Sequence, residues 1–333
     1  MFRKSRRRLI EGAVREIAGE QLQGIQQQCR DILEQLQQVN GQLAQIARRE
    51  SQLRAIVRRD IELEDEQRDL EELLRDPGTA AHVACAIQRA TLQSEPFPYA
   101  VVDDVLPKPL YAAVLKGIPP VEIFADRPAN KQQLTVPFAL APAYSRTVWR
   151  FITGVAVSDW MMPAILEKFR EPVHAWITHN WPSVDPASIQ FHSSDGRILR
   201  RERGYRIPPH RDPKWAFITG ILYLARRTDS AAWGTQLYTV EGDEEARGPA
   251  PHWIDPARCR HVTDVAFRPN RLLVFLNSVG AHGAYIPDDA EPETLDRYIY
   301  QFRIAPTLES MAVLKAALPE DRRPFWAGKS ADY

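Results

Sequence analysis

The N-terminal part of the chain carries its apolar side chains in one narrow stripe. Steps of three and four residues separate successive apolar positions, and the frame resumes beyond a polar Glu50. These positions are Leu22, Ile25, Cys29, Ile32, Leu36, Val39, Leu43, Ile46, Leu53 and Val57. All 26 prolines lie at Pro77 or later, so no proline interrupts a helix before that residue. The pattern therefore predicts a long helix over residues 1–76 with a heptad seam of the coiled-coil type.

A narrow apolar stripe is buried only by another helix, so the seam predicts a homo-oligomer. Two alternatives remain open from the sequence, namely a helical hairpin and a long helix folded back on its own domain. The basic stretch 48–59 is followed by the acidic stretch 60–72, which favours staggered or antiparallel contacts. The residues Asp76-Pro77-Gly78 end this segment, and a shorter linker helix is expected within 77–96.

From residue 97 onward the apolar pattern is typical of short strands. A strand and a turn over 97–107 precede an expected helix over 108–116, and another helix is expected over 157–170. Further on, apolar runs alternate with turn residues at 189–192, 203–207, 216–224, 235–240, 261–267, 271–276, 282–286 and 297–304. Eight strands at this spacing predict an α+β fold: a double-stranded β-helix (jelly roll) with flanking helices over 97–310, and a C-terminal tail over 311–333.

Composition narrows the functions to be considered. Basic and acidic residues number 43 each, and the resulting formal net charge of zero offers no electrostatic case for nucleic acid. The three cysteines lack the spacing of a disulfide framework or a metal site, so a reducing cytoplasm is the expected setting. No apolar stretch is long enough to span a membrane. The basic stretch 3–8 is interpreted as a solvated helix start, which we favour over contact with an anionic membrane surface.

Two histidines and one aspartate supply the candidate chemistry. His210 and Asp212 lie two residues apart, so an extended backbone projects both side chains from one side and Arg211 from the other. His282 follows a buried-strand pattern and a turn containing glycine, and it opens the next strand. Two imidazoles and one carboxylate occupy one face of an octahedral Fe(II) and leave the remaining positions open. The three residues are therefore candidate ligands of a catalytic iron.

In motif order and spacing, residues 97–306 resemble the 2-oxoglutarate/Fe(II)-dependent dioxygenases, in particular their prolyl-hydroxylase-like branch. The segments that carry the resemblance are 97–106, His210-Arg211-Asp212-Pro213, 219–224, 233–237, 269–275 and His282-Gly283. Segment 233–237 departs from the family's Gly-Gly-Glu-Leu turn, because the second glycine and the glutamate are replaced. The predicted coiled coil lies outside the resemblance.

The resemblance implies a cation that binds the distal carboxylate of 2-oxoglutarate. Arg297 is our choice because it lies in the strand after the distal histidine, and an arginine binds a carboxylate through two parallel hydrogen bonds. Arg303 is the alternative, since a spacing of six residues along a strand places both arginines on one side. Thr219 and Tyr223 match family positions that contact the cosubstrate, although Tyr223 also fits a plain core tyrosine.

Two further positions refine the implied chemistry. Ile299 stands where the family often has a hydroxyl residue that assists in holding the carboxylate, so Tyr223 or Tyr205 would have to substitute. Related halogenases replace the metal-binding carboxylate by a small residue, whereas this chain keeps Asp212, so hydroxylation is implied. The implied reaction consumes 2-oxoglutarate and O2 at Fe(II), is compatible with ascorbate as a reductant, and releases succinate and carbon dioxide.

The sequence leaves the substrate open between a small molecule, a saccharide and a protein side chain. It also leaves two other functions open. One is a coiled-coil interaction protein whose jelly roll is inactive, and the other is a cupin-like module that binds a sugar or another small molecule. The intact ligand set and Arg297 argue against the first of these and less firmly against the second.

Overall fold

The computed structural model describes residues 2–124, 132–136, 138–243 and 252–326. The chain divides into two compact units, residues 1–57 and 58–333, and each is described by itself. Among the described residues, no helix is both long enough and apolar enough to cross a lipid bilayer. Cys29, Cys85 and Cys259 are free cysteines in the structure.

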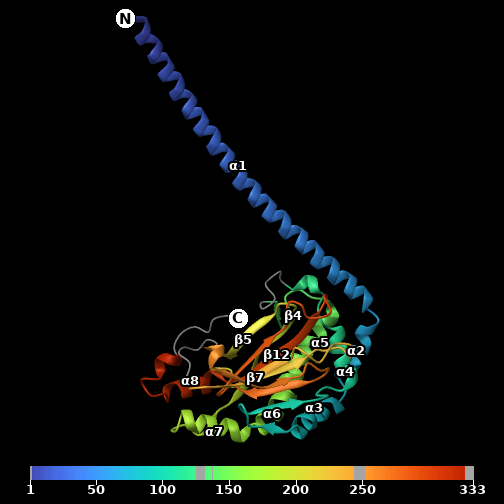
Figure 1. The fold of residues 1–333 in the computed structure, drawn as a ribbon. Coiled ribbons are helices and arrows are strands. Elements are labelled where there is room, and N and C mark those ends of the chain that lie inside the picture. Colours follow the sequence, from blue (N-terminus) through green and yellow to red (C-terminus); the bar gives the residue numbers. More distant parts are fainter. Residues whose placement is uncertain (1, 125–131, 137, 244–251, 327–333) are drawn as a thin grey trace. The chain divides into compact units, whose positions relative to one another are not determined.

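Helix α1 (Phe2–Glu62) forms the first unit and ends in the second (Figure 1). Its uninterrupted course excludes a hairpin turn within this range, which was one alternative to a coiled coil. The apolar residues of the seam are 49–61% exposed, and they are Leu22, Ile25, Ile32, Leu36, Val39, Leu43, Ile46, Leu53 and Val57. The described part of the chain therefore does not bury this stripe, and the coiled coil stays a prediction.

The second unit starts in the last turns of α1. The carboxylate of Asp60 accepts a hydrogen bond from the backbone N–H of Ala143 at 2.6 Å. After a turn, helix α2 (Glu66–Leu74) follows, and Glu66 forms an ion pair with Lys116. These contacts attach the residues after 57 to the other helices of this unit. The single long helix is thus shorter than the span expected from the sequence.

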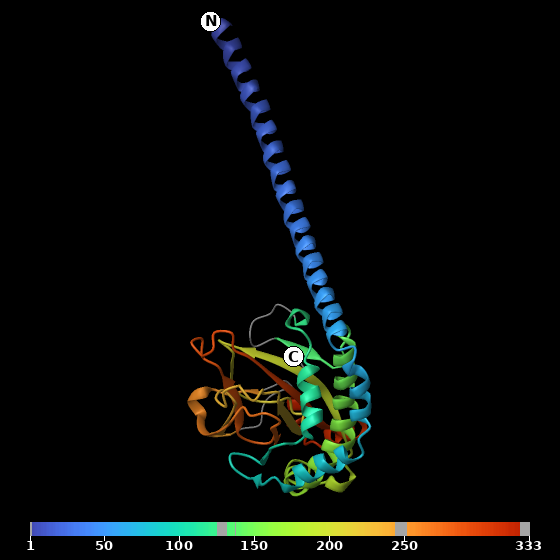
Figure 2. The same cartoon turned by 90° about the vertical axis from the view of Figure 1, so that its right-hand side faces the viewer.

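The helices of the second unit gather along one side of its sheets (Figure 2). They are α3 (Gly78–Arg89), α4 (Lys108–Lys116), α5 (Ala143–Phe151), the π-helical segment η3 (Ile152–Met161), α6 (Met162–Lys168), α7 (Arg170–Asn180) and α8 (Leu308–Ala316). The hydroxyl of Thr153 lies 2.8 Å from that of Tyr300, and the Trp149 ring packs 5.1 Å from the Tyr300 ring. The helical region expected over 157–170 extends further in both directions, because apolar positions continue on both sides.

Two antiparallel sheets form the body of the second unit. The larger has the strand order β1-β2-β10-β6-β12-β4-β3, and the smaller has the order β8-β5-β11-β7-β9. The strands are β1 (Leu92–Gln93), β2 (Tyr99–Val102), β3 (Gln133–Thr135), β4 (Phe191–Glu202), β5 (Arg206–Arg211), β6 (Ile218–Tyr223), β7 (Thr235–Val240), β8 (His252–Trp253), β9 (Cys259–Val265), β10 (Leu272–Leu276), β11 (Ala281–Tyr285) and β12 (Asp296–Pro306). This arrangement confirms the predicted jelly roll with flanking helices.

The inner faces of the two sheets enclose an apolar cluster. Ile221, Leu237, Leu273 and Phe275 are its central members, and each is at most 4% exposed. Side chains alternate along each strand, so one face of β12 packs outward, as Tyr300 does, while the other face points between the sheets. The candidate site occupies the space between the sheets beside this cluster.

The structure corrects the bounds of the first two main strands. The first was expected over 189–192, but β4 continues through Arg200, Arg201 and Glu202, all paired in register with β12. The second was expected over 203–207, but β5 begins at Arg206, after a turn in which Gly204 has a φ of 74°. The charged residues Arg200, Arg201 and Glu202 have the composition of a solvated turn. They form a strand because β12 provides the residues with which they pair.

Candidate metal centre and pocket

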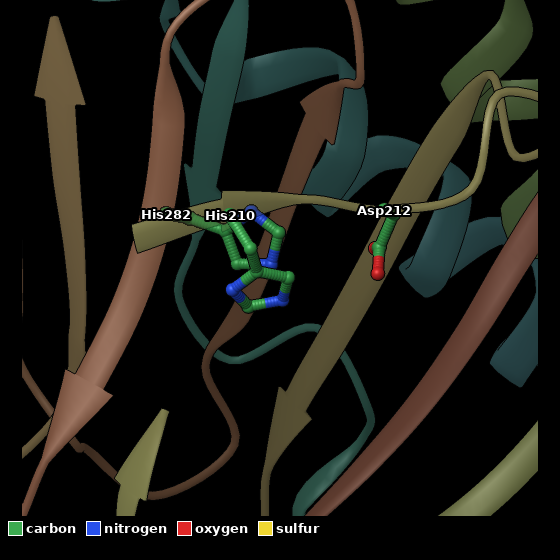
Figure 3. Close-up of side chains that lie close together, drawn as sticks. All are labelled: His210, Asp212 and His282. Atoms are coloured by element: carbon green, nitrogen blue, oxygen red, sulfur yellow. The ribbon is translucent and has the colours of Figure 1, made fainter. Parts of the chain in front are cut away.

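Neighbouring strands of the smaller sheet bring the candidate metal ligands together. β11 pairs with β5, and His282 lies directly opposite His210 in the register. Asp212 follows the end of β5 and turns toward the same side as His210 (Figure 3). Potential ligand atoms of the three side chains all lie within 4.8 Å of one another, and all three residues are buried. Two neighbouring strands thus place the three candidate ligands close enough to share one metal ion.

Hydrogen bonds hold His210 and Asp212 in orientation. Nδ1 of His210 lies 3.0 Å from the backbone carbonyl of Pro208, an arrangement that places the proton on Nδ1 and leaves Nε2 for a metal. One carboxylate oxygen of Asp212 accepts from the Thr219 hydroxyl at 2.5 Å, and the other accepts from Arg303 at 3.0 Å. The side chains around the candidate ligands thus restrict their rotation before any metal binds.

Asn277 fixes the backbone that carries Asp212. Its side-chain amide donates to the backbone carbonyl of Asp212 at 2.9 Å, of Pro213 at 3.2 Å and of Ala216 at 3.1 Å. Asn277 follows β10, and its three hydrogen bonds restrain the backbone of the turn after β5. The position of the candidate carboxylate ligand depends on both sheets.

The electrostatics of the three side chains suit metal binding. Burial, together with the neighbouring His210, lowers the pKa of His282 to about 3, and burial also lowers the pKa of His210. Burial alone would raise the pKa of Asp212, but Arg303, the imidazoles and the Thr219 hydroxyl together hold it below its ordinary value. At neutral pH the site therefore offers two neutral imidazoles and one carboxylate, the donor set and charge that Fe(II) takes in open facial sites.

The candidate ligands line a pocket between the two sheets, here called the inter-sheet pocket. Four arginines on the adjacent strands β4 and β12 also line it, and they are Arg197, Arg201, Arg297 and Arg303. Among its described lining residues, Asp212 supplies the one carboxylate. The pocket is therefore strongly cationic at neutral pH, and it suits negatively charged ligands.

Arg297 lies in the inter-sheet pocket and is 3% exposed. Its guanidinium donates to the backbone carbonyls of Ala232 and, at 2.6 Å, of Ser230, and it lies 4.2 Å from the centre of the Phe267 ring. Burial lowers the pKa of Arg297 to about 10, so the group remains charged at neutral pH. These contacts fix the orientation of a cation that could hold a carboxylate.

Arg303 shares a strand face and the pocket with Arg297, as the spacing predicted. It pairs directly with Asp212, so it belongs to the metal end of the pocket. The hydroxyl of Thr219 bonds the same carboxylate. Both residues thus contact a candidate metal ligand, a relationship that the sequence did not indicate.

Tyr223 belongs both to the apolar cluster and to the wall of the pocket. Its hydroxyl lies 2.8 Å from that of Thr235 and accepts the backbone N–H of Thr235 at 3.1 Å. Burial raises the pKa of Tyr223 to about 12, so the phenol keeps its proton. Tyr205 and Ile299 also line the pocket, so both tyrosines named as substitutes for the hydroxyl missing at Ile299 lie in its wall.

A second cavity also has Asp212 in its lining and therefore adjoins the candidate metal centre. Arg211, whose side chain was expected to point away from His210, lines this cavity and forms an ion pair with Asp243. Lys214 and Arg322 add further positive charge to its wall. Because Asp212 lines both cavities, the candidate metal centre lies where they adjoin.

Arg201 is a pocket residue that the sequence reasoning missed. In a strand, residues 197, 199 and 201 lie on one face, and this spacing could have indicated that Arg201 faces the same side as Arg197. Arg197, Leu199 and Arg201 all line the inter-sheet pocket. This signal was hidden because the expected strand stopped at 192.

Comparisons with known proteins give likenesses of fold at low sequence identity. No protein-family model and no curated protein matches the sequence. A prolyl 4-hydroxylase from Phytophthora capsici is 18% identical, with a TM-score of 0.41 over 73% of this chain and 68% of that chain. A prolyl-4-hydroxylase from Pseudomonas putida is 14% identical, with a TM-score of 0.37 over 67% of this chain and 98% of that chain.

HygX from Streptomyces hygroscopicus, solved with nickel, 2-oxoglutarate and hygromycin B bound, is 13% identical to this chain. The match has a TM-score of 0.40 and covers 63% of this chain and 83% of that chain. Prolyl 4-hydroxylases and HygX are thus among the solved structures to which this chain is similar.

Proposed function

We propose that this protein is a 2-oxoglutarate- and Fe(II)-dependent dioxygenase that hydroxylates its substrate. One observation carries the proposal: His210, Asp212 and His282 gather in a pocket that also receives the guanidinium of Arg297. A metal held by these three residues could bind the keto acid end of a small molecule, and the guanidinium of Arg297 could bind a carboxylate at its other end. Both features occur in 2-oxoglutarate.

The proposed reaction converts 2-oxoglutarate, O2 and a substrate C–H bond into succinate, carbon dioxide and a C–OH group. Fe(II), when bound by the three ligands, would supply the activation of O2. One oxygen atom enters succinate and the other enters the product. Oxidation of the substrate C–H bond releases two electrons, and oxidative decarboxylation of 2-oxoglutarate releases two more. These four electrons reduce O2, so the reaction balances without another reductant.

The residues of the chain would bind and orient the reactants. Arg297 would hold the distal carboxylate of 2-oxoglutarate, and the protonated hydroxyl of Tyr223 lines the same pocket. Thr219 and Arg303 keep Asp212 oriented and ionised. The three candidate ligands are buried between the two sheets, so bulk water would have limited access to a metal bound there.

The test is Fe(II)-dependent formation of succinate by the full-length protein, measured by chromatography with and without O2. We expect slow turnover without substrate, and its loss in Asp212→Ala. The matched control is Arg200→Gln, which alters a neighbouring strand position outside the lining of the inter-sheet pocket. If neither Fe(II) nor Mn(II) makes the wild-type protein bind 2-oxoglutarate, the proposal is wrong. A cupin-like binding module would bind the ligand and leave O2 unconsumed.

We also propose that the first unit joins two or more copies of this chain through the heptad seam. The seam consists of apolar side chains that are about half exposed on a helix without a break. Apolar residues at this spacing are buried by knobs-into-holes packing against a second helix. A second copy of the chain supplies an identical seam.

A further inference from the structure

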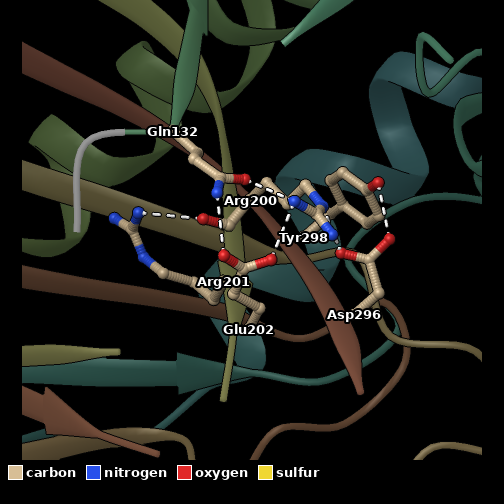
Figure 4. A network of polar contacts seen from close by, with 6 residues as sticks. All are labelled: Gln132, Arg200, Arg201, Glu202, Asp296 and Tyr298. Atoms are coloured by element: carbon tan, nitrogen blue, oxygen red, sulfur yellow. Dashed lines mark hydrogen bonds and ion pairs between the residues drawn. The ribbon is translucent and has the colours of Figure 1, made fainter. Parts of the chain in front are cut away.

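Two adjacent arginines on β4 have opposite environments. Arg200 donates to Asp296 at 2.7 Å and pairs with Glu202 at 2.9 Å, and Gln132 also accepts a hydrogen bond from it. Figure 4 shows this network on one side of the strand, with the guanidinium of Arg201 directed away from it. The charge of Arg200 is therefore compensated by carboxylates.

Arg201 is almost fully buried and lines the inter-sheet pocket. Its guanidinium lies 4.1 Å from the centre of the Tyr205 ring, and it donates to the backbone carbonyl of Arg200 at 3.3 Å. Within the described chain, no carboxylate pairs with it. Burial lowers the pKa of Arg201 because desolvation disfavours the charged form, yet a guanidinium stays protonated in proteins. A buried cation of this kind costs free energy unless an anion offsets it.

Arg201 and Arg297 lie opposite each other in the register of β4 and β12. Their guanidinium groups nevertheless lie against different parts of the pocket wall. Arg297 is held by Ser230, Ala232 and Phe267, whereas Arg201 is stacked on Tyr205. Two cations with different neighbours define two positions for anions in one pocket.

In the proposed function, 2-oxoglutarate uses one carboxylate at the metal and the other at Arg297, so none is left for Arg201. We propose that Arg201 binds an oxyanion group, a carboxylate or a phosphate, of the molecule that is oxidised. This inference rests on the proposed function, and it narrows the substrate to an organic anion. The planar fork of a guanidinium binds either group through two hydrogen bonds. Stacking on Tyr205 keeps the fork oriented toward the pocket.

The test uses the full-length protein loaded with Mn(II) and saturated with 2-oxoglutarate, which excludes turnover. Acetate and inorganic phosphate are titrated separately as probes by calorimetry, and the two arms distinguish a carboxylate site from a phosphate site. We expect saturable binding of at least one probe, weakened about tenfold or more in Arg201→Gln because a charged hydrogen-bond donor is lost. Arg201→Lys, which keeps the charge and loses the fork, should weaken binding less.

Two controls keep the outcome interpretable. Arg200→Gln removes the neighbouring guanidinium outside the pocket and should leave probe binding unchanged. The affinity for 2-oxoglutarate, together with the circular dichroism spectrum, should stay the same in Arg201→Gln. Absence of probe binding to the wild-type protein, or equal binding by Arg201→Gln, would overturn the inference. So would loss of 2-oxoglutarate affinity in a folded Arg201→Gln variant, since Arg201 would then belong to the cosubstrate site. Failure of the proposed function looks different, because the Mn(II)-loaded wild-type protein would not bind 2-oxoglutarate at all.

Discussion

The guanidinium of Arg303 lies 3.0 Å from the carboxylate of Asp212, and their side chains are only 4% and 2% exposed. Arg303 therefore offsets the charge of a buried carboxylate while the metal is absent. A bound divalent ion would place a second positive charge on the same carboxylate. If a metal binds Asp212, the pair would link the stability of the fold to the binding of that metal.

Replacing Arg303 by Met should destabilise the metal-free protein, because the carboxylate of Asp212 loses its buried counter-ion. Removal of one partner of a buried pair typically costs about 3–5 kcal/mol. Saturating Mn(II) should recover part of this loss by compensating Asp212. The free energy of unfolding in urea, with and without Mn(II), measures both effects. For comparison, Arg200→Gln breaks a more exposed network and should cost about 1 kcal/mol without recovery by metal. Equal losses with and without Mn(II) would contradict the link.

Acid should destabilise the metal-free protein through His282. The folded pKa of His282 is about 3, against an ordinary value of 6.5, so the unfolded chain binds the proton first as the pH falls. The free energy of unfolding should therefore decrease from pH 6.5 toward pH 3, by on the order of 4 kcal/mol from this residue. Urea unfolding at pH 7, 6 and 5 measures the slope, and His282→Gln should flatten it. An unchanged slope in the variant would show that other groups cause the pH dependence.

Arg297→Gln should weaken the binding of 2-oxoglutarate by roughly 10- to 100-fold, since a charged hydrogen-bond donor contributes about 1.5–3 kcal/mol. The affinity for Mn(II) alone should stay unchanged, because Arg297 contacts none of the three candidate metal ligands in the described structure. Calorimetry with each ligand separates the two effects. Arg303→Met offers the opposite test, since its first effect should be on the metal. If Arg303→Met abolished 2-oxoglutarate binding at saturating metal while Arg297→Gln did not, the roles of the two arginines would be reversed.

Disruption of the heptad seam should convert the protein into a monomer without loss of 2-oxoglutarate binding. Leu36→Lys combined with Leu43→Lys places two charges in the apolar stripe, and light scattering measures the mass. Gln38→Lys combined with Gln45→Lys adds the same charge outside the stripe and should leave the mass unchanged. Deletion of residues 1–57 should have the same effect as the seam variant. A monomeric wild-type protein would refute the proposed association.

The strand pattern was predictable wherever apolar runs had turn residues at both ends, as for residues 235–240 and 271–276. The sequence indicated His210, Asp212 and His282 as candidate ligands, whereas the direct opposition of His210 and His282 in the register came from the structure. The end of β4 was not predictable. Arg200, Arg201 and Glu202 have the composition of a solvated turn, and their partners on β12 lie almost a hundred residues away.

The roles of the pocket arginines required the three-dimensional structure for a related reason. Parity along a strand places Arg297 and Arg303 on one face, but it does not determine what each guanidinium contacts. Arg303 pairs with Asp212, which lies 91 residues away in sequence. Arg297 donates hydrogen bonds to the backbone carbonyls of Ser230 and Ala232. Contacts between side chains that are remote in sequence depend on the packing of the two sheets.

The register between β5 and β11 would give a metal bound by the three candidate ligands a role in folding. Sliding β11 by one residue would turn His282 to the opposite face of its sheet and remove it from His210. Only the native alignment can complete the three-ligand set, so an ion that binds the set shifts the population toward correctly paired strands. Iron supplied during synthesis would then act as a selector of strand alignment, before any catalysis takes place.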